Sequence, residues 1–398
     1  MATKKLYDID AYMTKFEAKV VACEELDYVS GKDNKSEGNT GEQGRYAVKL
    51  DQTLFFPEEG GQTPDKGTLD GIQVLDVQIK GDEIIHFLGE PLVVGATTKG
   101  EIDWKHRFSN MQQHSAEHIF SGTAYKKYGY RNVGFHLSDQ IVTMDFDHPF
   151  TEEQLAEMEW AVNEAIVANV EVITGYPSKE ELSKMEYRSK IDFDEGVRIV
   201  EIKGYDVCAC CAPHVACTGE IGMFKIQSAQ NYKGGMRISF LSGFRALEEY
   251  RNKAQVISKL SGILTTNQEQ LAENVQKLKN QTQTLKNQLM NARQTIMESK
   301  LENIPADQKN VLLFEIDLDT PVMRNVVNKL VEQHEGICGV FVGTDADGYN
   351  YIIGSKTKDC REVADAMKEK LGARGGGSAQ MVQGSVQARA EDIAEFIK

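Results

Sequence analysis

The segments HSAEH (residues 114–118) and CCAPH (residues 210–214) decide what this chain must fold around. The first holds two histidines spaced i, i+4, and the second holds a cysteine and a histidine at the same spacing. On a helix, that spacing puts both side chains on one face, one turn apart. Three imidazoles and a thiolate form a plausible tetrahedral zinc set, because Zn²⁺ favours nitrogen and sulfur donors. About ninety residues separate the pairs, so a folded domain must bring them together, and we expect a site inside a cleft. The alternative is a purely structural histidine pair.

The cysteines around the second segment leave the sulfur ligand open. Four of the seven cysteines lie within ten residues: Cys208, Cys210, Cys211 and Cys217. The cysteine count is odd, and the start MATKKLYDID is charged without an apolar core, so we expect a reducing, cytoplasmic setting rather than disulfides. Spacing favours Cys210, four residues before His214. Cys208 or Cys211 could replace it, or the group could hold a separate structural metal.

Composition limits the class of protein and its partners. A chain of 398 residues is long enough for two or three domains. No apolar run approaches 18 residues, so we expect a globular chain without a membrane span. The net charge of −15 disfavours a nucleic-acid partner, but residues 225–300 carry a local net charge of +7, which leaves −22 elsewhere. Such a basic stretch is either a phosphate-contacting surface or a solvated helix surface.

The first 170 residues change from strand patterns to helix patterns. The early runs of alternating apolar and polar residues predict strands over 46–56, 72–80 and 83–89. The Gly- and Pro-rich segment 55–67 predicts an irregular loop. A helical pattern over 110–130 would carry the histidine pair, with Gly129 as its stop. A strand is expected over 133–147 and a helix over 151–170, with Thr151 as its N-cap.

Residues 246–300 lack proline and predict two helices. The first covers 246–264, and the second begins after Thr266, with Glu269 completing a possible capping box. Heptad spacing in the second helix predicts a coiled coil or helical hairpin without identifying the partner helix. The d positions are Leu271, Leu278, Leu285 and Ala292, and the a positions are Val275, Thr282, Leu289 and Ile296.

A third unit is expected after Pro305. Apolar runs predict strands over 311–316, 339–345 and 349–356, and helical patterns cover 324–336 and 360–372. The glycine-rich run 372–386 follows. Its three glycines at 375–377, next to Arg374, could form a backbone nest for a phosphate. The alternative is a flexible loop between helix and strand.

Four motifs in this order resemble the alanyl-tRNA editing family, the free-standing AlaX proteins that are similar to the editing part of alanyl-tRNA synthetase. HSAEH is similar to the family's HxxxH, and CCAPHVACTGEIGMFKI (210–226) to its CxxxH motif and the stretch that follows. FFPEEGGQTPDKG (55–67) resembles the family's N-terminal barrel motif, and VTMDFDHPFTEEQL (142–155) its RFDFSH-like stretch. The family often has CGGTH where this chain has CCAPH. The C-terminal part resembles the DHH-associated domain of the long AlaX form.

The resemblance implies an α+β protein of four domains with one zinc site. We expect a β-barrel domain over 1–100, a zinc-binding α/β editing domain over 101–245, a helical hairpin or coiled coil over 246–304, and a DHH-associated α/β domain over 305–398. The implied zinc ligands are His114, His118, Cys210 and His214. No catalytic residue beyond the metal site is identified. Glu117 lies between the ligand histidines but points about 100° away from their face.

The resemblance also implies a function: hydrolysis of the ester in alanine tRNA mischarged with serine or glycine. Nucleotide and ATP binding are implied only at the level of the family, because the chain has no room for aminoacylation parts. The alternatives are a dimeric tRNA- or RNA-binding protein with a structural zinc, or a metal-dependent hydrolase of small esters. A homodimer could form through 271–296. Candidate substrate-binding residues are Gly60, Gly61, Gln62, His136 and Thr143. Candidate tRNA contacts are Lys225, Lys233, Arg237, Arg374, Gly375, Gly376 and Gly377.

Overall fold

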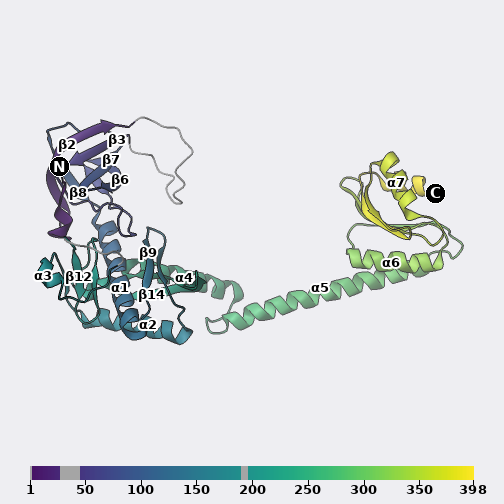
Figure 1. Ribbon diagram of the computed structural model, residues 1–398. Helices are drawn as coiled ribbons and strands as arrows, with labels where there is room; N and C mark the ends of the chain where they lie inside the picture. Colours follow the sequence, from purple (N-terminus) through teal and green to yellow (C-terminus); the bar gives the residue numbers. More distant parts are fainter. Residues whose placement is uncertain (1, 27–44, 190–195) are drawn as a thin grey trace. The chain divides into compact units, whose positions relative to one another are not determined.

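The computed structural model describes residues 2–26, 45–189 and 196–398 (Figure 1). The chain divides into two compact units, Met1–Val256 and Ile257–Lys398. Both units mix helices and sheets, so the expected α+β composition is confirmed. Within the described residues, no helix combines the length and apolar character needed to cross a membrane.

Six strands near the N-terminus pair into a closed barrel. Antiparallel pairing between the first and last of them, from Lys15 opposite Glu101 to Lys19 opposite Thr97, closes the ring. Alternate side chains of the first strand, such as Phe16 and Val20, are buried in the barrel core, as the two-residue period of a strand requires. In barrel order the strands are β2 (Lys15–Glu25), β3 (Tyr46–Leu50), β7 (Glu83–Leu88), β6 (Ile72–Lys80), β5 (Gly67–Leu69) and β8 (Thr97–Ile102).

A four-stranded antiparallel sheet follows the barrel in the first unit. Its strand order is β14 (Phe224–Tyr232), β15 (Gly235–Ser242), β10 (Val142–Phe146) and β9 (Asn132–Leu137). The expected strand over 133–147 is therefore a hairpin of two strands. Its apolar face packs against two helices, α1 (Trp104–Tyr128) and α2 (Glu152–Ala168).

The two helices begin and end close to the signals in the sequence. Gly129 caps α1 in the left-handed conformation, at a φ of 75°. Thr151 and Gln154 form a capping box at the start of α2. A smaller sheet of β11 (Val172–Gly175), β12 (Ile199–Ile202) and β13 (Asp206–Ala209) leads into the second ligand segment.

Two helices connect the sheets of the chain: α4 (Gly243–Leu264) and α5 (Leu271–Glu302). The expected capping box at Thr266 is wrong, because α5 begins at Leu271, after a turn. Only Met297 and Leu301, near the end of α5, are buried. The heptad positions are exposed, with Leu278 at 53 % and Leu285 at 64 %.

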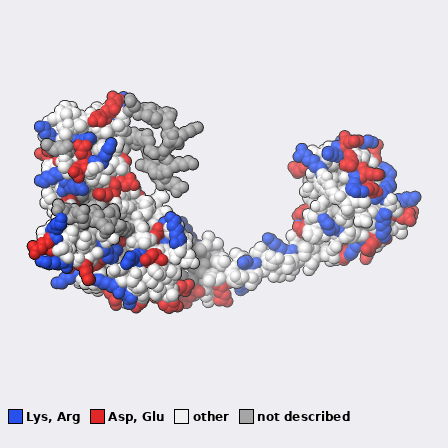
Figure 2. Space-filling model, in the orientation of Figure 1, with Lys and Arg blue, Asp and Glu red and all other residues white. Residues whose placement is uncertain are grey.

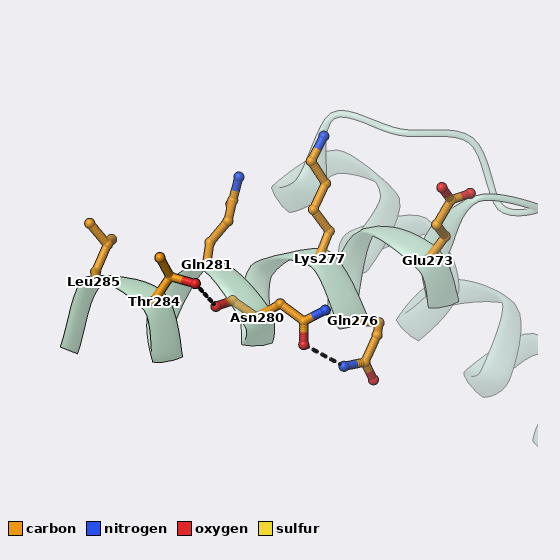
Figure 3. A pocket seen from close by; sticks show the side chains of 7 residues that line it. All are labelled: Glu273, Gln276, Lys277, Asn280, Gln281, Thr284 and Leu285. Atoms are coloured by element: carbon orange, nitrogen blue, oxygen red, sulfur yellow. Dashed lines mark hydrogen bonds between the residues drawn. The ribbon is translucent and has the colours of Figure 1, made fainter. Parts of the chain in front are cut away.

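Polar residues along α5 bond within the helix itself. Figure 3 shows Gln276 donating to Asn280 at 2.8 Å, and the Thr284 hydroxyl donating to the Asn280 carbonyl at 3.0 Å. On the face shown in Figure 2, α5 is mostly free of charged side chains. The side chains of Val275, Leu278, Leu285 and Leu289 are therefore exposed in the described structure.

The C-terminal unit is a five-stranded sheet between helices. Its strand order is β16 (Val311–Glu315), β17 (Cys338–Thr344), β18 (Gly348–Gly354), β20 (Met381–Val386) and β19 (Arg374–Gly377). One core holds α6 (Thr320–Gln333) and the end of α5. The other holds α7 (Cys360–Leu371) and α8 (Ala390–Ile397). The expected phosphate nest or flexible loop at the three glycines is wrong, because they form β19 and pair with β20.

Candidate metal centre

Two segments of the first unit bring four potential ligands together. His114 and His118 lie one turn apart on the buried side of α1, as their spacing predicts. Cys210 and His214 lie in an irregular segment after β13, where Pro213 cannot continue regular pairing. The helical argument therefore applies only to the first pair. The ligand atoms of all four residues lie within 4.8 Å of one another.

The spacing of the donors fits a tetrahedral zinc ion. Cys210 Sγ lies 3.6 Å from His114 Nε2 and 3.4 Å from His214 Nε2. Zinc–sulfur and zinc–nitrogen bonds of about 2.3 and 2.0 Å give a sulfur–nitrogen edge of about 3.6 Å in a tetrahedron. The three histidines are buried, and Cys210 is half-buried. The donor set is also chemically suited to zinc, because it contains only imidazole nitrogen and thiol sulfur.

Each histidine is oriented by a hydrogen bond at its other ring nitrogen. His114 Nδ1 donates to Gln62 Oε1 at 2.8 Å, and His118 Nδ1 donates to Asp206 Oδ2 at 3.0 Å. His214 Nδ1 lies 3.0 Å from the Ser115 hydroxyl oxygen. These partners fix the rings and leave the Nε2 atoms facing the centre, an arrangement typical of histidine metal ligands.

The carboxylate behind His118 belongs to a buried ion pair. Arg188 donates to both Asp206 oxygens, at 2.7 Å each. Although burial opposes it, the pKa of Asp206 is lowered by its hydrogen bonds from Arg188 and His118. Gly122 lets α1 approach this carboxylate, because a Cβ there would lie 2.6 Å from Asp206 Oδ1. The helix and the carboxylate are therefore packed closely enough to hold His118 in one orientation.

Burial disfavours the charged forms of two of the donors, Cys210 and His214. Burial raises the pKa of the Cys210 thiol well above its ordinary value and lowers the pKa of His214 well below its own. A divalent cation reverses this preference at the cysteine, since a coordinating thiol loses its proton. The donor set therefore suits a bound cation, whereas a charged side chain buried there without a counterion would be unfavourable.

The other cysteines of the cluster have different surroundings. Cys208 lies with His118 and Asp206 in a second possible ligand group, but Arg188 and His118 already occupy both Asp206 oxygens. Cys211 packs against the barrel core. Cys217 precedes a short 3-10 helix. Among the described cysteines, only Cys210 lies with all three histidines.

The Gly-Gly segment is a tight turn that reaches the centre. Gly60 and Gly61 have φ values of 64° and 85°, the left-handed pair of a type I′ turn between Glu59 and Gln62. The turn lies on β9: Leu137 N donates to Gly61 O at 2.7 Å. A Cβ at Gly61 would lie 2.2 Å from the Phe135 carbonyl oxygen, so the contact requires glycine. The turn places Gln62 against His114.

The structure brings some predicted substrate residues to the centre and leaves others away from it. Gln62 contacts a ligand histidine, and the two glycines form the turn beside it. His136 and Thr143 pair across β9 and β10, on the face opposite Phe135. Phe135 is the residue whose ring meets His114, at 4.8 Å between centroids. The side chains of His136 and Thr143 are therefore not brought to the donors.

The basic residues of the first unit are mostly paired within it. Lys225 donates to Glu159 at 2.6 Å, and Arg237 donates to both oxygens of Asp145, at 2.6 and 2.7 Å. In the second unit, Arg374 is exposed on β19. On the face shown in Figure 2, basic and acidic side chains are interspersed in both units. Of the predicted phosphate contacts, Lys225 and Arg237 are therefore engaged in ion pairs, whereas Arg374 is exposed.

Sequence reasoning missed the residues that orient the histidines. Asp206 and Arg188 carry no motif that separates them from the many other residues of their types, and Ser115 lies within HSAEH without a signal of its own for this role. The only usable signal is the short distance of Asp206 from Cys210 along the chain.

Comparisons with known proteins find two related kinds of protein, editing proteins and aminoacyl-tRNA ligases. A family model described as the threonyl and alanyl tRNA synthetase second additional domain matches residues 197–239, which include Cys210 and His214. The alanyl-tRNA editing protein Aarsd1 of Rattus norvegicus is 30% identical over 385 residues, covering 94% of this chain and 92% of the relative. Aarsd1 of Danio rerio is 28% identical over 387 residues, covering 95% and 93%. The alanine–tRNA ligase of Pyrobaculum neutrophilum is 27% identical over 417 residues, covering this whole chain but 44% of the ligase.

Proposed function

Because the chain belongs to the family of alanyl-tRNA editing proteins, we propose that it is a trans-editing aminoacyl-tRNA deacylase. Its substrate is alanine tRNA mischarged with serine or glycine. Its reaction is hydrolysis of the ester that joins the amino acid to the terminal adenosine. The observation that carries the proposal is the convergence of His114, His118, Cys210 and His214 within 4.8 Å.

Discrimination between alanine and serine requires a hydrolytic site in addition to the site that activates alanine. One added hydroxyl gives weak selectivity in a small activating pocket, so hydrolysis elsewhere must remove the errors. A pocket that spares alanine needs a hydrogen-bonding group for the serine hydroxyl. Gln62 supports this role, because its Oε1 accepts from His114 while its buried Nε2 has no hydrogen-bond partner within the described ranges. The backbone of Gly60 and Gly61 lines the same turn.

The four donors would hold zinc, with Gln62, Asp206 and Ser115 orienting the imidazoles. A bound zinc ion supplies a Lewis acid for the ester carbonyl or lowers the pKa of a water molecule. The Nε2 atoms then need no reorientation when substrate enters. Glu117 is an unsuitable base, since its carboxylate already accepts from Asn132 and from the Ser121 hydroxyl in a buried network.

The remaining parts of the chain would hold the tRNA body. We propose that Lys225, Lys233 and Arg237 contact phosphates near the acylated end, and that Arg374 with β19 contacts a second part of the tRNA. The ion pairs of Lys225 and Arg237 imply that these two must exchange a carboxylate for a phosphate. The exposed apolar stripe of α5 supports pairing with a second copy of the chain.

A second candidate function is favoured by one observation. Four protein donors alone complete a tetrahedral set, which is typical of structural zinc sites. In that case the chain is a dimeric tRNA-binding protein without hydrolase activity.

Deacylation of Ser-, Gly- and Ala-tRNA(Ala), measured side by side with zinc content, separates the two. The deacylase should hydrolyse Ser-tRNA(Ala) much faster than Ala-tRNA(Ala). Equal rates, or no turnover by zinc-loaded protein, would favour the binding protein. Hydrolysis that ignores the acceptor stem would indicate a small-ester hydrolase instead.

A further inference from the structure

The Gly60–Gly61 turn sets two side chains beside each other at the metal centre. Glu59 and Gln62 pair across the turn, with Gln62 N donating to Glu59 O at 3.0 Å. Residues directly opposite each other in an antiparallel pair project on the same face. Because Gln62 reaches His114 on that face, the Glu59 side chain lies on the side of the turn that faces the centre.

Several polar atoms at this turn are buried without partners. Glu59 Oε2, Gln62 Nε2 and the Tyr7 hydroxyl have no hydrogen-bond partner among the described residues. Tyr7 and Gln62 are almost wholly buried, at 1 % and 0 % exposure. Buried polar groups are nearly always satisfied by protein, water or ligand. Glu59 Oε2 and Gln62 Nε2, at the two ends of one turn, therefore point to a polar group bound beside it.

The same neighbourhood includes the thiol of Cys211. A Cβ at Gly60 would lie 3.6 Å from Cys211 Sγ. A cysteine side chain carries no positive charge in either protonation state, so Cys211 cannot neutralise Glu59.

Other buried carboxylates of the first unit are neutralised by arginine. Asp65 pairs with Arg107, Asp206 pairs with Arg188, and Asp8 lies 3.3 Å from Arg198 Nε. Within the described ranges, Glu59 forms no ion pair with lysine or arginine. Burying a carboxylate without a cation is costly, so the missing charge is best supplied by what binds there.

We infer that the Glu59 carboxylate receives the α-ammonium group of the aminoacyl ester. The inference rests on the proposed function, because it places the ester carbonyl at the four-donor centre. In an aminoacyl ester the ammonium is bonded to the carbon next to that carbonyl, so both reach one side of the turn. Serine, glycine and alanine share the ammonium. Glu59 therefore strengthens binding of every aminoacyl group and leaves the choice of side chain to Gln62.

The test compares two substrates and two matched variants. Ser-tRNA(Ala) and N-acetyl-Ser-tRNA(Ala), which lacks the charged amine, are hydrolysed by the wild type, Glu59→Gln and Glu58→Gln. Glu58 is the control because it is exposed and accepts from Gln78 at 2.8 Å. Glu59→Gln should lower kcat/KM for Ser-tRNA(Ala) by about 10- to 100-fold, the range for a hydrogen bond to a charged group. It should change the N-acetyl substrate by less than about threefold, and Glu58→Gln should change neither.

Equal losses on both substrates, or no loss, would overturn the inference while leaving the deacylase intact. If Glu59→Gln does not fold or does not bind zinc, the inference is tested by comparing the two substrates with the wild-type protein alone. Its rates on the two substrates, each divided by spontaneous hydrolysis, must favour the free amine by about tenfold or more, and equal ratios contradict the inference. Absence of hydrolysis by the wild type would remove the proposed function and this inference together.

Discussion

The candidate metal centre and the exposed heptad side chains of α5 differ in whether their contacts lie within the same chain. At the centre, each ligand histidine has a hydrogen-bond partner within the same chain. Along residues 271–292 of α5, apolar heptad side chains have no packing partner in the described structure, and Leu289 is 51 % exposed. The first region is complete in one copy of the protein. The second presents exposed apolar side chains at heptad spacing.

Removing one metal ligand should have the largest effect on the candidate metal centre. His118→Ala should lose most of its zinc and its deacylation together, because it removes one of the four donors and weakens the hold on the cation. His136→Ala is the matched control, since that histidine lies on the other face of the sheet. Metal analysis and Ser-tRNA(Ala) hydrolysis measure both. If zinc is retained in His118→Ala but lost in His136→Ala, the metal ligands have been assigned incorrectly.

Weakening the support of a donor should have a smaller effect. Asp206→Asn should lower zinc affinity by about 10- to 100-fold, because His118 loses the carboxylate that orients it. Competition with a chelator measures the affinity without relying on activity. Asp145→Asn removes a comparable carboxylate–arginine pair away from the centre and should leave the affinity unchanged. Equal losses in both variants would mean that Asp206 only stabilises the fold.

Truncation after Val256 tests whether the second unit holds tRNA. Affinity should fall by about tenfold, and the slope of log K against log salt should decrease by about 0.9 for each phosphate that the shortened protein no longer binds. Hydrolysis should persist at high tRNA concentration, since all four donors precede the cut. An unchanged slope and affinity would exclude the second unit as a tRNA-binding element.

Substitutions on α5 should reduce self-association while changing the rate of hydrolysis very little. Leu278→Glu with Leu285→Glu should reduce self-association, because charges replace the apolar seam. Gln276→Glu with Gln283→Glu adds the same charges outside the seam and serves as the control. Sedimentation measures the mass, and hydrolysis should change by less than about twofold. A monomeric wild type would contradict pairing between copies.

The features that the sequence predicted correctly are those that depend on a few neighbouring residues. The i, i+4 histidines and the Gly129 stop follow from helix geometry, and both are confirmed. The Thr266 cap is wrong because α4 is followed by a turn, in which the Asn267 side chain accepts from Gln270 N at 3.0 Å, and α5 begins only at Leu271. The glycines at 375–377 suggested a loop, since glycine disfavours strands in isolation, yet pairing with β20 holds them extended.

The candidate site shows the same division. Two motifs identified the four donors, because ligand types and spacing are visible in the chain. The face of β9 that His136 occupies depends on strand register, which a single sequence does not fix. Asp206 and Arg188 act through contacts across distant segments, so their roles became visible only in the folded structure.

The distance along the chain between the donors has a consequence for biosynthesis. A ribosome adds about 5 to 20 residues per second, so roughly 5 to 20 seconds pass between the emergence of His118 and that of His214. The barrel strands and Gln62 precede both and can fold first. A metal ion held by all four donors could therefore be bound only after the segment with Cys210 and His214 has been synthesised and has folded against α1.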